Sequence, residues 1–182
     1  MRQDARNNRE RILQAADAVF GEHGAAGSTE EVARRAGVGI GTVFRHFPTK
    51  EALLSAALSR HLAALGAVAE QAMDAPDGAT GLRSLVEAMV RTGGSKVALA
   101  SLLDPLPLDA RTASEELRRS VGVVLRRAKA EGAVRPTVTL DQLYLLIRGL
   151  SHASAMAPPS ARALRGATDI VLAGLLVDAS EG

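Results

Sequence analysis

Apolar side chains recur at helical spacing near the start of the chain. The first stripe consists of Ile12, Ala16, Val19 and Phe20. Because these positions share one face at 3.6 residues per turn, they predict an amphipathic helix that runs to His23. Gly24 follows, and glycine suits the left-handed conformation that commonly ends a helix. The segment before the stripe carries Arg2, Arg6 and Arg9, and we expect it to be a disordered basic tail.

Two short helices are predicted next. Ser28 and Glu31 have the spacing of a capping box, in which the serine hydroxyl accepts from the glutamate amide and the glutamate side chain reaches back. A helix should therefore start directly after Ser28 and end near Gly37. Pro48 disfavours helix at the residue before it, which leaves room for a helix of about two turns at residues 40–46.

The rest of the chain is also predicted to be helical. Thr49 caps a helix with a long apolar stripe, and capping patterns at Thr139 and Ser160 start the last two helices. The stripe consists of Leu53, Leu54, Ala57, Leu58, Leu62 and Leu65. Further helices are predicted at residues 79–91, 96–103 and 111–131, with TGGS and DPLPLD as connections between them. No segment alternates with period two, so the predicted fold class is all-α, with about nine helices.

Composition narrows the function classes. The 182 residues include no cysteine, which excludes disulfides and thiolate metal sites. The four histidines are scattered, and the chain has neither an HExxH motif nor a Gly-rich phosphate loop after a strand. We therefore expect no enzyme, no cofactor and no metal site. The charged N-terminus and the lack of a long uncharged apolar run predict a soluble cytoplasmic protein without a membrane partner.

The stretch ARRAGVGIGTVF, residues 33–44, contains two short helices joined by a tight turn with glycine. This is the sequence form of a helix-turn-helix, whose second helix enters the DNA major groove. Val43 and Phe47, one turn apart, should seat the second helix on the first helix of the chain. The side chains left free for the groove and its phosphates are those of Ile40, Gly41, Thr42, Phe44, Arg45 and His46.

Three consecutive segments carry a resemblance to a known family. They are RERILQAADAVFGEHG, STEEVARRAGV and GIGTVFRHFPTKEALL, within roughly residues 9–58. In order and spacing they resemble the N-terminal DNA-binding domain of the TetR family of bacterial transcriptional regulators. The resemblance implies a three-helix helix-turn-helix DNA-binding domain at residues 1–50 and a helical C-terminal ligand-binding and dimerisation domain at residues 51–182.

The resemblance also implies roles for single residues. Residues that read bases or the adjoining sugars and phosphates would be Ile40, Gly41, Thr42 and Arg45. Arg45 is the candidate for a bidentate contact to guanine, and Ile40 can touch a thymine methyl group. Ser28 and Thr29 would offer a hydroxyl and amides to a phosphate, while His46 and Lys50 would contact phosphates.

Two positions depart from the family pattern. Phe44 stands where the family often has a tyrosine that bonds a phosphate, so we expect Phe44 to pack against sugar or protein. Gly39 replaces the more usual serine at the start of the recognition helix, which removes another possible phosphate contact.

By the same resemblance, the last two helices would pair with their copies in a homodimer. Their apolar residues include Leu143, Ile147, Leu150, Ile170, Val171, Leu175 and Leu176. Three glycines, Gly149, Gly166 and Gly174, would permit close approach. A plain intramolecular core is the alternative. We favour the dimer because a palindromic operator needs a two-fold partner.

An effector pocket is expected inside the C-terminal domain. The candidate ligand-binding residues are Met89, Leu103, Tyr144, Arg148 and His152. Arg148 and His152 are four residues apart, so they share a helical face and could meet a polar or anionic group. Plain core is the alternative for each apolar residue, and contact with the partner or solvent is the alternative for His152. The domain has one tyrosine and no other aromatic ring, which favours a small or aliphatic effector.

The predicted function is a sequence-specific DNA-binding transcriptional regulator. By resemblance it would be a repressor released from a palindromic operator by a small-molecule effector. The alternative is a ligand-binding or adaptor protein with a degenerate DNA-binding head, which Gly39 and Phe44 would allow. A steep fall of DNA affinity with salt, without preference among sequences, would favour that alternative.

Overall fold

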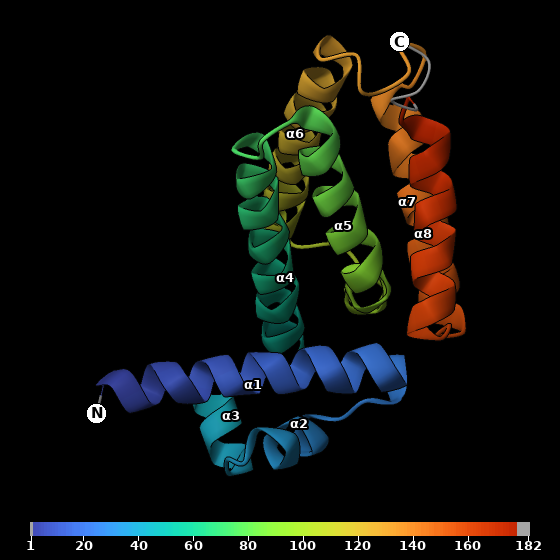
Figure 1. The fold of residues 1–182 in the computed structure, drawn as a ribbon. Helices are drawn as coiled ribbons and strands as arrows, with labels where there is room; N and C mark the ends of the chain where they lie inside the picture. The colour runs from blue at the N-terminus through green and yellow to red at the C-terminus, as the bar shows by residue number, and fades with distance from the viewer. Residues whose placement is uncertain (1, 178–182) are drawn as a thin grey trace. The chain divides into compact units, whose positions relative to one another are not determined.

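The computed structural model describes residues 2–177. Within them every regular element is a helix, apart from one isolated bridge between Val134 and Leu176 (Figure 1). The elements are α1 (Arg2–His23), the 3-10 helix η1 (Gly24–Ala26), α2 (Thr29–Ala36), α3 (Ile40–His46), α4 (Lys50–Met73), α5 (Gly78–Ser101), α6 (Leu108–Ala130), α7 (Leu140–Met156) and α8 (Ala161–Leu175). The all-α prediction is confirmed, and the helix count in the described part is close to the predicted nine.

The chain forms two compact units, each built from two separate stretches. Unit 1 comprises residues 1–61 and 95–111, and unit 2 comprises residues 62–94 and 112–182. The helices α4 and α5 therefore contribute residues to both units. The domain boundary at residue 50 stays a sequence-based prediction.

In unit 1 the predicted α1 stripe forms the core against α2 and α3. Ile12, Val19 and Phe20 are fully buried. Each large apolar side chain removed from water contributes about 1.5–3 kcal/mol. Gly27 lies directly on this core, because a Cβ there would be 2.8 Å from Cδ1 of Phe20. The chain can pass this closely over the ring only with glycine at that position.

The prediction of a disordered N-terminal tail is wrong. α1 begins at Arg2, so Arg6 and Arg9 lie within the helix. Asp4 in the first turn is favourable there because the helix dipole is positive at its N-terminus. The Arg9 guanidinium lies 5.3 Å from the centroid of the Phe47 ring, a cation–π contact that holds this part of α1. The side chain of Arg2 is outside the described residues.

Residues 78–101 form the single helix α5, so the predicted break at TGGS is wrong. The glycines serve close packing within unit 2. A Cβ on Gly93 would lie 1.9 Å from Oγ of Ser151, and a Cβ on Gly94 would lie 3.3 Å from Cβ of Ser154. Glycine inside a helix costs about 1 kcal/mol relative to alanine, and the close approach of α5 and α7 offsets that cost.

The predicted caps of the later helices are confirmed. Thr49 Oγ1 accepts from the Ala52 amide at 3.1 Å at the start of α4. Thr139 and Gln142 form a complete capping box on α7. Ser160 Oγ accepts from the Ala163 amide at 3.2 Å on α8. Each bond satisfies a helix-terminal amide that has no partner inside the helix.

Among the described helices, α4 is long and apolar enough to cross a membrane, with a mean hydropathy of 1.4. Its middle carries Arg60, which donates to Glu10 at 2.7 Å and to Asp17 at 2.9 Å, all within unit 1. Leu53 and Leu58 of the same helix are buried. Ion pairs in mid-helix together with a buried apolar face are typical of a core helix in a globular protein.

Candidate nucleic-acid interface

The helices α2 and α3 are joined by the three residues between Ala36 and Ile40. Gly37 ends α2 with φ of 64° and ψ of 40°, the left-handed conformation that glycine adopts without strain. Its amide and that of Val38 return to carbonyls of the last turn of α2, at 3.2 and 3.1 Å. Gly39 then caps α3 in an extended conformation, without a side-chain hydrogen bond. The local sequence thus folds as the predicted helix-turn-helix.

Arg11 of α1 fixes this turn. Its Nη2 donates to the carbonyl oxygens of Ala36 and Gly37, at 2.5 and 3.2 Å. A Cβ on Gly37 would lie 2.7 Å from the same nitrogen, so the site needs glycine for space as well as for its backbone angles. A cation at a helix C-terminus also complements the helix dipole. Sequence reasoning missed this role, because both acceptor carbonyls lie far from Arg11 along the chain.

The two faces of α3 differ as predicted. Val43 and Phe47 are buried on the inner face. On the outer face Ile40 is 38 % exposed, Phe44 is 43 % exposed, and Arg45 is exposed as well. Among the described residues Arg45 has no ion pair or side-chain hydrogen bond, so its guanidinium is available to a ligand. A free arginine beside two exposed apolar side chains can meet base edges and phosphates.

The other predicted DNA-binding residues surround this face. Gly41 is exposed, and Thr42 and His46 are half-buried. Ser28 and Thr29 are half-buried at the start of α2, where the Ser28 hydroxyl already accepts from the Glu31 amide at 3.1 Å. The nine candidates thus lie on or next to α3 and at the N-terminus of α2, within unit 1. Their contacts with DNA stay predictions.

Lys50 is oriented toward protein atoms. Its Nζ donates to the Gly27 carbonyl at 2.8 Å and lies 5.2 Å from the centroid of the Phe20 ring. The ammonium group therefore stabilises the chain reversal between α1 and α2. An ammonium has three donors, so this bond leaves capacity for a phosphate. Loss of Lys50 should accordingly affect the folding of unit 1 as well as any phosphate contact.

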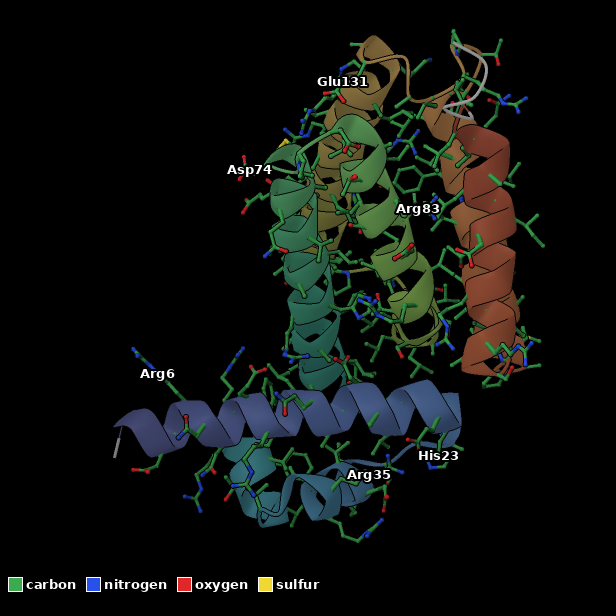
Figure 2. All side chains as sticks on the ribbon, in the orientation of Figure 1. Arg6, His23, Arg35, Asp74, Arg83 and Glu131 are labelled. Carbon is green, nitrogen blue, oxygen red and sulfur yellow. The ribbon has the colours of Figure 1, made fainter. Side chains whose placement is uncertain are left out.

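The two arginines of α2 are already paired. Arg34 donates to Glu31 at 2.6 and 2.9 Å, and Arg35, which Figure 2 labels, donates to Glu31 at 3.1 Å and to Glu22 at 2.8 Å. Hydrogen bonds from Arg34 and then Arg35 lower the pKa of Glu31 to about 2. The Glu31 carboxylate is taken up by these bonds, so only the Ser28 half of the predicted capping box forms. Free positive charge consequently lies with α3 rather than with α2.

Unit 1 also holds two titratable groups, Asp17 and His61, whose pKa values are shifted mainly by burial. Burial raises the pKa of Asp17 to about 6, against the opposing effect of its salt bridge with Arg60. Burial, helped by the charges of Lys96 and Arg60, lowers the pKa of His61 to about 4. Nε2 of His61 is buried without a hydrogen-bond partner. His61 is therefore neutral at neutral pH.

The five predicted ligand-binding residues differ in burial and belong to both units, and their role stays a prediction. Met89 is buried in unit 2, and Leu103 is buried in unit 1. Tyr144 is half-buried, its hydroxyl has no partner, and burial raises its pKa to about 12. Arg148 and His152 are exposed on α7. Met89, Leu103 and Tyr144 are thus at least half-buried, whereas Arg148 and His152 lie on the surface of the chain.

Two family profiles match the chain. The profile described as bacterial regulatory proteins of the tetR family matches residues 12–57. The profile of the C-terminal domain of SbtR-like transcriptional regulators matches residues 75–177, more than half of the chain.

Known proteins agree with these profiles. A TetR transcription regulatory protein from Mycobacterium vanbaalenii is 30 % identical with a TM-score of 0.74, and the match covers 97 % of this chain and 99 % of that one. A TetR transcriptional regulator from Streptomyces coelicolor is 28 % identical with a TM-score of 0.77, over 94 % and 99 % of the two chains. A curated HTH-type transcriptional regulator of Staphylococcus aureus (strain USA300) is 40 % identical over 63 residues, so the match spans about a third of either protein. The chain belongs to the TetR family of bacterial transcriptional regulators and carries their DNA-binding helix-turn-helix domain.

Proposed function

We propose that the protein is a repressor that binds a palindromic operator as a homodimer and is released by a small-molecule effector. The observation that carries this proposal is that α3 has one buried face and one exposed face. Its inner face is fixed by buried Val43 and Phe47, and its outer face presents Ile40, Phe44 and an unpaired Arg45. A short helix whose inner face is packed in the core, and whose outer face carries a free arginine, suits the reading of a major groove.

Within this proposal each side chain has a distinct task. Arg45 donates two hydrogen bonds to one guanine per half-site, and Ile40 contacts a thymine methyl group. The amides at the start of α2, next to Ser28 and Thr29, bind a phosphate. His46 and Lys50 bind phosphates that position the head without specifying sequence.

The homodimer is proposed to form through α7 and α8. Large apolar side chains protrude from these helices, with Leu145 72 %, Met156 86 % and Ile170 75 % exposed in the single chain. Cβ atoms added to Gly149, Gly166 or Gly174 would meet nothing within 4 Å. Exposed apolar groups interleaved with open glycine positions fit a second copy of the same helices, since burying them removes apolar surface from water.

The effector is proposed to act by population shift. It would bind the C-terminal part in a state whose two heads are wrongly spaced for successive major grooves. The unpartnered hydroxyl of Tyr144 is a candidate hydrogen-bonding group for it, because a buried polar group without a partner costs free energy. The helix α4 extends from Lys50 to Met73. It therefore connects the DNA-reading head, residues 1–50, covalently to the C-terminal domain. We expect the protein to act in the bacterial cytoplasm and to have no enzymatic activity.

A second candidate is a ligand-binding protein whose head has lost sequence preference. It is favoured by Phe44, which has no hydroxyl, and by Gly39, which caps α3 without a side chain.

Selection from a random-sequence pool of duplexes by the purified protein, repeated at raised salt, separates the two candidates. The repressor requires a palindrome with half-sites spaced for two heads, and enrichment that survives the added salt. Binding that is lost with salt and never favours any sequence would favour the degenerate head.

A further inference from the structure

Unit 2 contains a cavity of about 300 Å³ between α5 and α8, which is separate from the five ligand-binding residues predicted from the sequence. α5 contributes Glu87 and Arg91, and α8 contributes five residues between Ala161 and Asp169. A cavity of this size is at the small end of the range for sites that hold small molecules.

The charges around the cavity are only partly paired. Arg83 on α5, which Figure 2 labels, lies 3.9 Å from the Glu87 carboxylate and 3.8 Å from that of Asp169, so it partly neutralises both carboxylates. Arg91 and Arg165, by contrast, have neither an ion pair nor a side-chain hydrogen bond within the described residues. Three arginines therefore face two carboxylates, which leaves one positive charge in excess and two guanidinium groups without a partner.

The α8 wall between these charges is less polar. Leu164 is half-buried, and Thr168 is buried with its hydroxyl donating to the Leu164 carbonyl at 2.8 Å. Because that proton is already used, the Thr168 hydroxyl can offer a ligand only an acceptor. Ala161 adds a further small apolar side chain. A fitting ligand thus needs an apolar portion for this wall.

We propose that this cavity binds a small organic monocarboxylate with a short aliphatic chain. Arg91 and Arg165 bind the carboxylate from opposite walls, and the chain covers Leu164 and the Thr168 methyl group. Guanidinium groups suit this task because they are weakly hydrated and donate in a planar fork that matches a carboxylate. An inorganic anion would leave the apolar wall in water, and an amine would face the excess positive charge.

The site deepens the proposed function by giving the effector a chemical class and a binding place other than Tyr144, and so it rests on that proposal for its regulatory meaning. Arg165 and Asp169 immediately precede Gly166 and Ile170 on α8, which belong to the proposed dimer face. A ligand held here would therefore act on the helix through which two copies are proposed to pair.

The test is a titration of the full-length protein with hexanoate, followed by the amide chemical shifts of an assigned NMR spectrum. We expect saturable shifts on α5 and α8 around Arg91 and Arg165. Arg91→Gln and Arg165→Gln should each weaken hexanoate about tenfold, since each removes one charge-assisted contact. Arg162→Gln is the matched control, because Arg162 is an exposed arginine of α8 that does not line the cavity. It should leave the affinity unchanged.

Three results would overturn the site. Equal affinity for 1-hexanol, hexylamine or inorganic phosphate would show that the carboxylate and chain are not recognised together. Unchanged affinity in both cavity variants would exclude the two arginines. Amide shifts that follow protein concentration and not hexanoate concentration would show that a second copy of the chain occupies the cavity.

The failure of this site can be told apart from the failure of the proposed function. If the protein binds hexanoate but selects no duplex, the site is supported and the repressor proposal is refuted. If it binds an operator but not hexanoate, only the site is refuted.

Discussion

Two surfaces of this protein expose large apolar side chains, yet their surroundings differ. On α3, Ile40 and Phe44 stand beside the unpaired Arg45 and the half-buried His46. On α7 and α8 the exposed Met156 and Ile170 have open glycine positions near them in sequence. Exposure alone does not tell which partner a surface takes. Positive charge among the apolar groups favours a polyanion, and small residues among them favour a closely packed protein helix.

The two surfaces also differ in how they are supported. α3 has only seven residues, and its orientation depends on Arg11 holding the turn before it and on buried Val43 and Phe47 behind it. α7 and α8 are long, separately capped helices. We therefore expect the reading head to be sensitive to changes that do not touch DNA, and the α7–α8 surface to be sensitive mainly to changes on its outer face.

The largest expected effect comes from a charge in the proposed dimer face. Ile170→Glu should convert the dimer to a folded monomer and lower operator affinity by about 100-fold or more, since the two heads would no longer bind as a linked pair. Sedimentation velocity and a duplex-binding assay measure the two changes. Val123→Glu, at an exposed apolar position on α6, is the control and should leave both unchanged. If Ile170→Glu is still a dimer, α8 is not part of the dimer interface.

The next largest effect is on sequence preference. Arg45→Ala should weaken operator binding by about 1–3 kcal/mol and relax the preference at one base pair per half-site. Arg34→Ala is the control, because Arg34 is an exposed arginine already paired with Glu31 and should change binding little. Duplex selection with each variant gives the comparison. Equal loss in both variants would mean that the head uses arginine only as diffuse positive charge.

The next effect is a dependence of stability on pH that comes from unit 1. The pKa of His61 is about 4 in the folded protein and near 6.5 when unfolded, so the unfolded state binds more protons between these values. Stability from this group is complete above pH 6.5 and falls as the pH drops toward 4, by about 2 kcal/mol at pH 5. Asp17, with a raised pKa of about 6, acts in the opposite direction, because its folded form holds the extra proton as the pH falls below 6.

A variant of His61 separates the contributions of His61 and Asp17 to the pH dependence of stability. His61→Leu removes the histidine term, so its stability should fall less between pH 7 and pH 5 than that of the wild type, or should rise. Denaturant unfolding at the two pH values measures this difference. Parallel pH curves for the two proteins would show that His61 is not held neutral by its surroundings.

The smallest expected effects are changes in the free energy of unfolding when either of two glycines is replaced by alanine. Gly37→Ala should destabilise unit 1 by about 1–2 kcal/mol, because alanine is strained at φ of 64° and its Cβ would crowd Arg11. Gly66→Ala, inside α4 with open space around it, should stabilise by about 0.5–1 kcal/mol. Thermal unfolding of both variants checks the opposite signs. A tolerated Gly37→Ala would mean that the turn can rearrange.

Features set by neighbouring residues were predictable from sequence. The caps at Ser28, Thr49, Thr139 and Ser160, and the bounds of α3, depend on side chains within a few positions. The buried and exposed faces of α3 followed from helical periodicity alone.

Features set by distant contacts were not predictable. TGGS contains the usual residues of a turn, but Gly93 packs against Ser151 on another helix. Arg11 and Lys50 both carry positive charge near the head, and no local pattern indicates that each donates to backbone carbonyls across the fold. The cavity beside Arg91 and Arg165 likewise depends on which faces of α5 and α8 meet in unit 2.

The central claim is that the two apolar surfaces take different partners. Hydroxyl-radical labelling read by mass spectrometry tests it directly, because Phe44 and Met156 are both reactive reporters. We predict that Met156 is protected in the free protein relative to Ile170→Glu, while Phe44 is protected only when the selected duplex is added. Met73, also exposed, serves as the internal reference. Equal labelling of Met156 in the wild type and Ile170→Glu, or of Phe44 with and without the duplex, would contradict the account.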